Sequence, residues 1–207
     1  MQDDRSFAQL TRAEAAKEIV ARALKDLELR AQLFREGARE GYPPALRALH
    51  RANAEDLIAL VGAHGWPMSD IDGPEAAEAA FLIAQHVIGE PPLMRELLAL
   101  LSDAVERSRA PAWQMAVLAD RIAVFEGRGQ IFGTHFDWDD AGALSPSPIA
   151  DAEHVDQRRE MVALTPLAEE IARQREDAAR DGERAPADLA AHRERQAAFA
   201  RDAGWRT

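Results

Sequence analysis

The chain has 207 residues, no cysteine and a formal net charge of −11. Its length suffices for one substantial domain with a buried core, and 47% hydrophobic with 29% charged residues is ordinary globular composition. The acidic balance argues against binding to nucleic acid or to anionic lipid. The absence of cysteine excludes disulfides, thiolate nucleophiles and thiolate metal sites.

The N-terminal residues MQDDRSFAQL have no secretory signal pattern, and no apolar stretch is long enough to span a membrane. We therefore expect a soluble, cytoplasmic protein without a membrane segment. Thr11 and Glu14 have the spacing of a capping box, which predicts a helix that begins there and ends near Arg35. One stripe of this helix is predicted to face the core, namely Ile19, Ala23, Leu24, Leu27 and Ala31.

Glycines and prolines at 37–44 predict a loop, and a second helix follows that ends at HGWP, residues 64–67. Two further helices, PEAAEAAFLIAQHVIG (74–89) and PAWQMAVLADRIAVFEG (111–127), are apolar nearly all round. Such helices are buried on most sides, so we expect them at the centre of the fold. The intervening residues 91–109 predict an ordinary amphipathic helix.

The segment GQIFGTH (129–135) breaks the helical pattern. Alternation from Gln130 to Phe136 predicts a short strand, Asp139–Gly142 is typical of a turn, and residues from Ala143 predict a return strand. Helices are predicted again after residues 151, 166 and 188. The sequence thus predicts a mainly α protein: a single helical domain over 1–207, with about seven or eight helices and one short β-hairpin near residues 129–146.

Polar pairs interrupt the two apolar helices, Gln85 with His86 and Asp120 with Arg121. A buried polar group costs about 1–3 kcal/mol when it has no partner, so these groups must find one another or the hairpin. His86 and Asp120 could form an oriented imidazole–carboxylate couple. A structural polar network and a functional cleft both account for this pattern, and the sequence leaves both open.

On the predicted strand, Gln130 and Thr134 share one face and His135 lies on the other. Gly133 would let a ligand or a helix approach the backbone closely. His135 and Asp137, with His86 as a third ligand, are an alternative divalent-metal site, although the pair alone is a weak signal. Arg158 could hold an anionic substrate group or pair with surface acids.

Several short motifs occur in order along the chain: HGWP, AQH, LADRI, GQIFGTH, SPIAD, VDQRR, ALTPL and the closing GW. This series resembles a bacterial family catalogued as domain of unknown function 6624, from about residue 50 to the end, with residues 1–49 as an N-terminal helix and loop. In that family the strand motif usually reads Gln-x-Tyr-Gly-Thr-Gln, so Phe132 and His135 depart from it. The resemblance implies a shared site formed by Gln85, His86, Asp120, Arg121, Gln130, Thr134 and Arg158.

We therefore expect a metal-independent enzyme that acts on a small polar molecule. His86 would be the general acid or base, Asp120 would orient it, and the substrate would bind Gln85, Arg121, Gln130, Thr134, His135 or Arg158. The alternative is a non-catalytic helical module that binds a protein partner or a small ligand, with Trp113, Trp138 or Trp205 as anchors. For the enzyme we expect His86→Ala and Asp120→Asn to leave the fold largely intact and to abolish ligand binding or turnover, whereas unfolding of both variants would mean that the polar cluster is structural.

Overall fold

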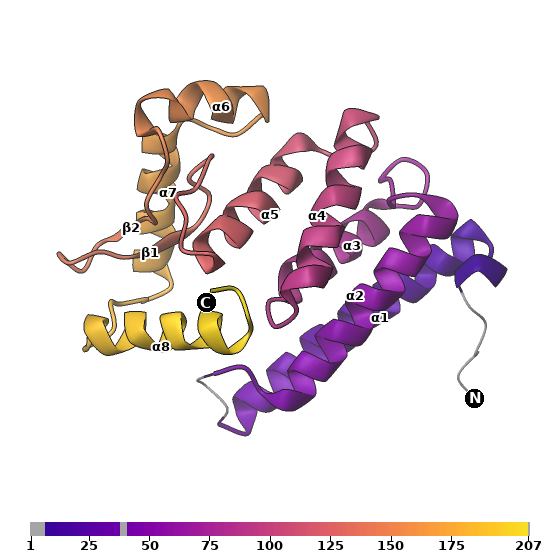
Figure 1. Cartoon of the computed structure of the whole chain (residues 1–207), viewed down its shortest axis with the longest axis horizontal. Coiled ribbons are helices and arrows are strands. Elements are labelled where there is room, and N and C mark those ends of the chain that lie inside the picture. The colour runs from indigo at the N-terminus through magenta and orange to yellow at the C-terminus, as the bar shows by residue number, and fades with distance from the viewer. Residues whose placement is uncertain (1–6, 38–40, 207) are drawn as a thin grey trace. The chain divides into compact units, whose positions relative to one another are not determined.

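A computed structural model of the chain describes residues 7–37 and 41–206. These residues form eight α-helices, two short 3₁₀ helices and one two-stranded antiparallel sheet (Figure 1). The predicted mainly α fold with one β-hairpin is therefore confirmed. Contacts between residues divide the chain into two compact units, Met1–Pro111 and Ala112–Thr207. Within the described ranges, every helix is too short or too polar to cross a membrane.

The first unit is entirely helical. It contains η1 (Phe7–Gln9), α1 (Arg12–Arg35), α2 (Pro44–His64), α3 (Pro74–His86) and α4 (Pro91–Glu106). Helix α1 packs against α2 and α3, and α2 also packs against α4. Large aliphatic side chains from all four α-helices fill the interior, including Ile19, Leu57, Ile83, Leu97 and Leu101.

The capping box that begins α1 is confirmed, but the buried stripe of this helix differs from the prediction. Leu24 and Leu27 are exposed, whereas Ile19, Ala23 and Asp26 are buried. The spacing of these three residues keeps them on one helix face. The prediction failed because it assigned the inner face to apolar residues, and this face includes a carboxylate.

The second unit contains the hairpin and four α-helices. It contains α5 (Ala112–Phe125), β1 (Phe136–Trp138), β2 (Leu144–Pro146), η2 (Ala152–His154), α6 (Val155–Met161), α7 (Leu167–Arg180) and α8 (Leu189–Asp202). Helix α7 contacts both β2 and α6. The buried apolar side chains of this unit include Leu118, Ile122, Val155, Ala200 and Trp205.

The hairpin is shorter than predicted. Its turn forms as expected, because the Asp139 carboxylate accepts hydrogen bonds from the N–H groups of Ala141 and Ala143. However, β1 begins at Phe136, and Gln130 makes only an isolated bridge with Ile149. The alternation along 130–135 does not produce a strand, because the chain turns at Gly133 (φ +67°) and backbone groups of Ile131, Phe132 and Thr134 bind side chains. Only the two ends of the segment, Gln130 and His135, pair with the backbone of residues 147–150.

The capping box predicts the effect of Thr11→Ala. The Glu14 N–H donates to the Thr11 hydroxyl at 3.3 Å, and the Glu14 carboxylate accepts from the Thr11 N–H at 2.8 Å. Loss of the hydroxyl should lower the free energy of unfolding by about 1 kcal/mol. Chemical denaturation measures it, with Thr11→Ser as a control that keeps the hydroxyl. Equal destabilisation by Ala and Ser would contradict the role of the cap.

Candidate functional site

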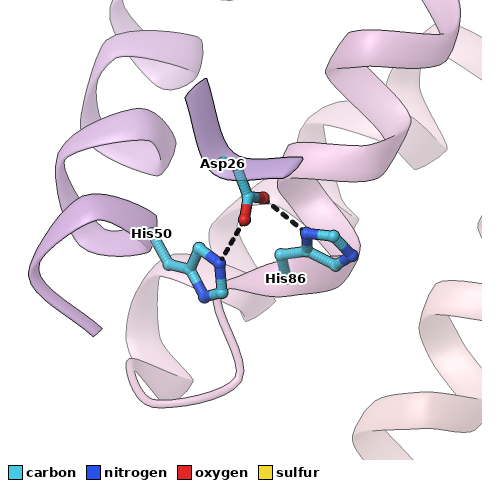
Figure 2. A group of neighbouring side chains, drawn as sticks. All are labelled: Asp26, His50 and His86. Carbon is cyan, nitrogen blue, oxygen red and sulfur yellow. Dashed lines mark hydrogen bonds and ion pairs between the residues drawn. The ribbon is translucent and has the colours of Figure 1, made fainter. Parts of the chain in front are cut away.

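A buried aspartate joins two histidines in the first unit. Asp26 lies on α1, His50 on α2, and His86 is the last residue of α3. Figure 2 shows the Asp26 carboxylate between the two imidazoles. His86 Nδ1 lies 2.5 Å from Asp26 Oδ2, and His50 Nε2 lies 2.9 Å from Asp26 Oδ1. Three helices thus meet at one carboxylate.

Access to this cluster is limited to His86. The side chains of Asp26 and His50 are 0% and 2% exposed, whereas that of His86 is 14% exposed. Burial opposes ionisation of Asp26, but the hydrogen bonds from His50 and His86 outweigh it, so the net effect lowers the pKa of Asp26. The aspartate is therefore an anion that the two imidazoles hold in place.

Two neighbouring residues complete the hydrogen bonding of the imidazoles. The Tyr42 hydroxyl lies 2.7 Å from His50 Nδ1. Arg30 Nη1 lies 3.3 Å from His86 Nε2. A guanidinium can only donate, so His86 Nε2 is the accepting nitrogen and Nδ1 carries the proton that Asp26 accepts. This arrangement directs the lone pair of Nε2 away from Asp26, to the side of the ring where Arg30 lies.

The same cluster has the spacing of a metal site. One ligand atom from each of Asp26, His50 and His86 lies within 4.8 Å of the others. Among residues 7–37 and 41–206 this is the one such group, and it differs from the alternative set of His135, Asp137 and His86. A metal ion at these atoms would have to displace the proton on His86 Nδ1, because a protonated nitrogen has no lone pair to donate.

Asp120 has a different neighbourhood from the one predicted. Its carboxylate is completely buried in the second unit and binds the segment after α5. Its four hydrogen-bond donors are the N–H groups of Ile131, Phe132 and Thr134 and the Thr134 hydroxyl. His86, for which the sequence predicted a couple with Asp120, instead pairs with Asp26 in the first unit, and the Asp120 oxygens bind this segment.

Gln130 and two arginines hold the same segment from its other sides. The Gln130 side chain accepts from the His135 N–H at 2.7 Å and donates to the carbonyls of His135 and Ser147. Arg159 is buried and donates to the Phe132 carbonyl at 2.7 Å. Of the two roles predicted for Arg158, the structure shows the pairing with a surface acid, since its guanidinium lies 3.2 Å from the Asp151 carboxylate. Arg158 also donates to the backbone carbonyls of Ile131, Ala150 and Asp151. These polar side chains fix the backbone of residues 130–135.

The glycine in this segment has a packing role. At Gly133 an added Cβ would lie 2.7 Å from a side-chain carbon of Ile149 and 3.2 Å from one of Leu167. The positive φ of Gly133 also disfavours other residues. The close approach that the sequence predicted is therefore made by two apolar side chains.

The remaining predicted residues occupy two places. Arg121 and His135 line a cavity in the second unit, together with Asp137. Gln85 is half-buried on α3 in the first unit. Burial, and then the charge of Arg121, lower the pKa of His135 to about 4. His135 is therefore neutral at pH 7.

Sequence reasoning missed Asp26, His50 and Tyr42. Asp26 lies among charged residues in the run KDLELR, and nothing in the helical pattern marked it as buried. One signal was available. His50 lies on the same helical stripe as Asn53 and Leu57, and a helix stripe that mixes polar and apolar residues can indicate a buried polar cluster.

The contacts of Asp120 predict the effect of Asp120→Asn. An amide would direct N–H donors at backbone N–H groups, so the variant should lose about 3 kcal/mol of stability through groups left unpaired. Denaturation and hydrogen exchange at Ile131, Phe132 and Thr134 measure the loss. Asp140→Asn is the matched control, because that carboxylate is 90% exposed. A variant as stable as this control would contradict the structural role.

The lowered pKa of His135 predicts a pH-dependent stability. The unfolded chain, with a pKa of 6.5, binds a proton more readily than the folded chain, with a pKa of about 4. The stabilisation is complete above pH 6.5 and decreases as the pH falls towards 4, by up to about 3 kcal/mol. The difference in unfolding free energy between wild type and His135→Leu should shrink over this range. The exposed-histidine variant His154→Leu should show no comparable change.

Comparison with known proteins places the chain in a family but gives no activity. The model of a family described as "Family of unknown function (DUF6624)" matches residues 14–181. This region contains Asp26, His50, His86 and the whole segment 130–135, and it begins earlier than the expected residue 50 and ends before the C-terminus. No curated protein and no solved structure matches the chain.

Proposed function

The chain belongs to this family of unknown function, DUF6624, and from the geometry of the Asp26–His50–His86 cluster we propose that it is an enzyme acting on a small polar molecule. His86 is the general base, and later the general acid. The observation that carries the proposal is the pairing of His86 Nδ1 with the buried Asp26 carboxylate at 2.5 Å, which leaves Nε2 as the accepting nitrogen.

Proton transfer through His86 follows from this pairing. The substrate first displaces the Arg30 N–H from Nε2. Nε2 then takes a proton from water or from a substrate hydroxyl, and the ring becomes an imidazolium ion. The Asp26 carboxylate stabilises that charge across the Nδ1–H bond, as the aspartate does in a catalytic triad. The proton returns from Nε2 to the leaving group, which restores the neutral ring.

Neighbouring residues support this role. The second oxygen of Asp26 is held by His50, and His50 is held by Tyr42, so the carboxylate cannot rotate away from His86. Arg30 lies beside Nε2 and supplies a cation for an anionic part of the substrate. The exposed edge of His86 gives the substrate its access.

The residues of the proposed site differ from those that the sequence suggested. His86 keeps its catalytic role, but Asp26 replaces Asp120 as the group that orients it. The contacts of Asp120 and Gln130 fit a supporting role for the segment 130–135. The reaction that we propose uses no metal: His86 Nδ1 keeps its hydrogen bond to Asp26 throughout, and a metal ion would bind there only in place of that proton. We further propose that it takes place in the cytoplasm.

The experiment is to incubate the protein with a polar metabolite extract and follow each compound by mass spectrometry. Wild type should consume at least one compound, and His86→Ala should reduce that rate by about 10²–10⁴-fold, the usual contribution of general acid–base catalysis. His154→Ala is the matched control, since His154 is exposed and bonded to Asp151. Unchanged consumption by His86→Ala, or none by wild type, would refute the proposal.

Treatment with a chelator tests whether the reaction needs a metal ion. Turnover should be unchanged after treatment with EDTA, and the purified protein should contain no stoichiometric transition metal. Loss of turnover with EDTA and recovery with zinc would instead identify Asp26, His50 and His86 as metal ligands.

One observation favours the alternative of a non-catalytic binding module. Leu24, Leu27 and Phe34 on α1 are all about half exposed, and their spacing places them on one side of the helix. A partner protein could cover these side chains. The predicted anchor Trp205 does not contribute, since it is buried and stacks on Phe125. Failure of wild type to consume any metabolite would favour this alternative.

A further inference from the structure

The second unit contains a cavity that the proposed reaction does not use. Its volume is about 290 Å³, which is near the lower end of the range for small-molecule sites. Residues from α5, from the start of the hairpin and from α8 line it, with Arg206 after α8. All of its lining residues belong to the second unit, so the cavity is built by residues 112–207 alone.

One wall presents a buried hydrogen-bond acceptor. His135 Nε2 is enclosed, and no residue of the described ranges 7–37 and 41–206 makes a hydrogen bond with it. The ring also bonds with the Val117 backbone, which accounts for Nδ1 as the donor and leaves the lone pair on Nε2. A buried polar atom without a partner in the fold is uncommon, and a ligand is one explanation for it.

Two guanidinium groups give the cavity a positive lining. Arg121 and Arg206 outnumber the single carboxylate, Asp137, which is itself bonded to His192 at 3.1 Å. Arg206 donates to the carbonyls of Phe125 and Val124, which fixes its position on the wall. A local excess of positive charge on a chain of net charge −11 favours an anionic ligand.

The remaining wall is apolar and aromatic. Phe125 and Phe199 have ring centroids 5.9 Å apart, and both line the cavity with Val124 and Phe136. Trp205 stacks behind Phe125 at 5.2 Å and holds that ring in place. Such a surface accepts the flat apolar body of a ligand.

We propose that this cavity binds a small organic carboxylate with a flat apolar body and a hydroxyl group. The carboxylate pairs with the arginine side, the body lies on Phe125 and Phe199, and the hydroxyl donates to His135 Nε2. Asp120 and Gln130 fix the backbone that carries His135. Because Nε2 is enclosed, the imidazole turns towards the cavity when the ligand binds.

Isothermal titration calorimetry with four probes tests each part of this assignment. 4-Hydroxybenzoate and 4-hydroxyphenylacetate have the three required groups and differ in the distance between carboxylate and hydroxyl. At least one should bind with one-to-one stoichiometry. Benzoate lacks the hydroxyl and 4-hydroxybenzamide lacks the charge, so both should bind about tenfold more weakly than 4-hydroxybenzoate or not at all. Absence of binding by both hydroxy acids at millimolar concentrations would overturn the proposal.

Variants locate the binding. Arg121→Gln and His135→Leu should each lower the affinity for the hydroxy acid by about tenfold. His135→Gln should lower it less, because the amide oxygen of Gln accepts a hydrogen bond. Arg180→Gln removes an equal charge from a guanidinium that is 65% exposed and should bind as wild type does. Equal affinity in all four variants would overturn the assignment. An affinity loss in Arg180→Gln as large as that in Arg121→Gln would also overturn it.

Nuclear magnetic resonance of the wild type gives a result that does not depend on the folding of any variant. Addition of the bound hydroxy acid should shift the Nε2 resonance of His135 and leave that of the exposed His154 unchanged. Binding without a shift at His135 would place the ligand elsewhere and refute the proposal.

Discussion

Each unit of the protein depends on one completely buried carboxylate. An ionised aspartate can remain away from water only where hydrogen bonds replace those that water would make. Asp26 meets this requirement with two imidazoles, and Asp120 meets it with backbone N–H groups and a threonine hydroxyl. Removal of either carboxylate would leave several buried donors without partners, so the surrounding helices and loop are built around these two groups.

The partners of the two carboxylates determine what each can do. The partners of Asp26 are side chains that exchange protons, and one of them, His86, reaches the surface. The partners of Asp120 are backbone groups, which hold a conformation but exchange no protons in the physiological range. The buried carboxylate of the first unit therefore suits the proton transfer that we propose, whereas that of the second unit holds the backbone of residues 130–135.

The motifs that resemble the family divide in the same way. AQH ends α3 and brings His86 to Asp26, whereas LADRI, GQIFGTH and VDQRR supply the side chains that bind the backbone of residues 130–135. Arg121 on α5 and His135 at the end of this segment line the cavity of the second unit. One series of motifs thus supplies residues to the Asp26 cluster of the first unit and to the backbone segment 130–135 of the second.

The sequence by itself determined the mainly α class, the capping box of α1, the turn at Asp139–Gly142 and the need of Asp120 for buried partners. These features depend on local spacing or on the free energy of burying a polar group. Only the tertiary structure decided which partner each polar group takes. Asp26 and His86 are 60 residues apart, and a helical pattern reports which face of a helix is polar but not which distant side chain meets it. The structure also decided that residues 130–135 form a loop and not a strand. The buried side chains of Asp120 and Arg159 bind backbone groups that strand pairing would otherwise use.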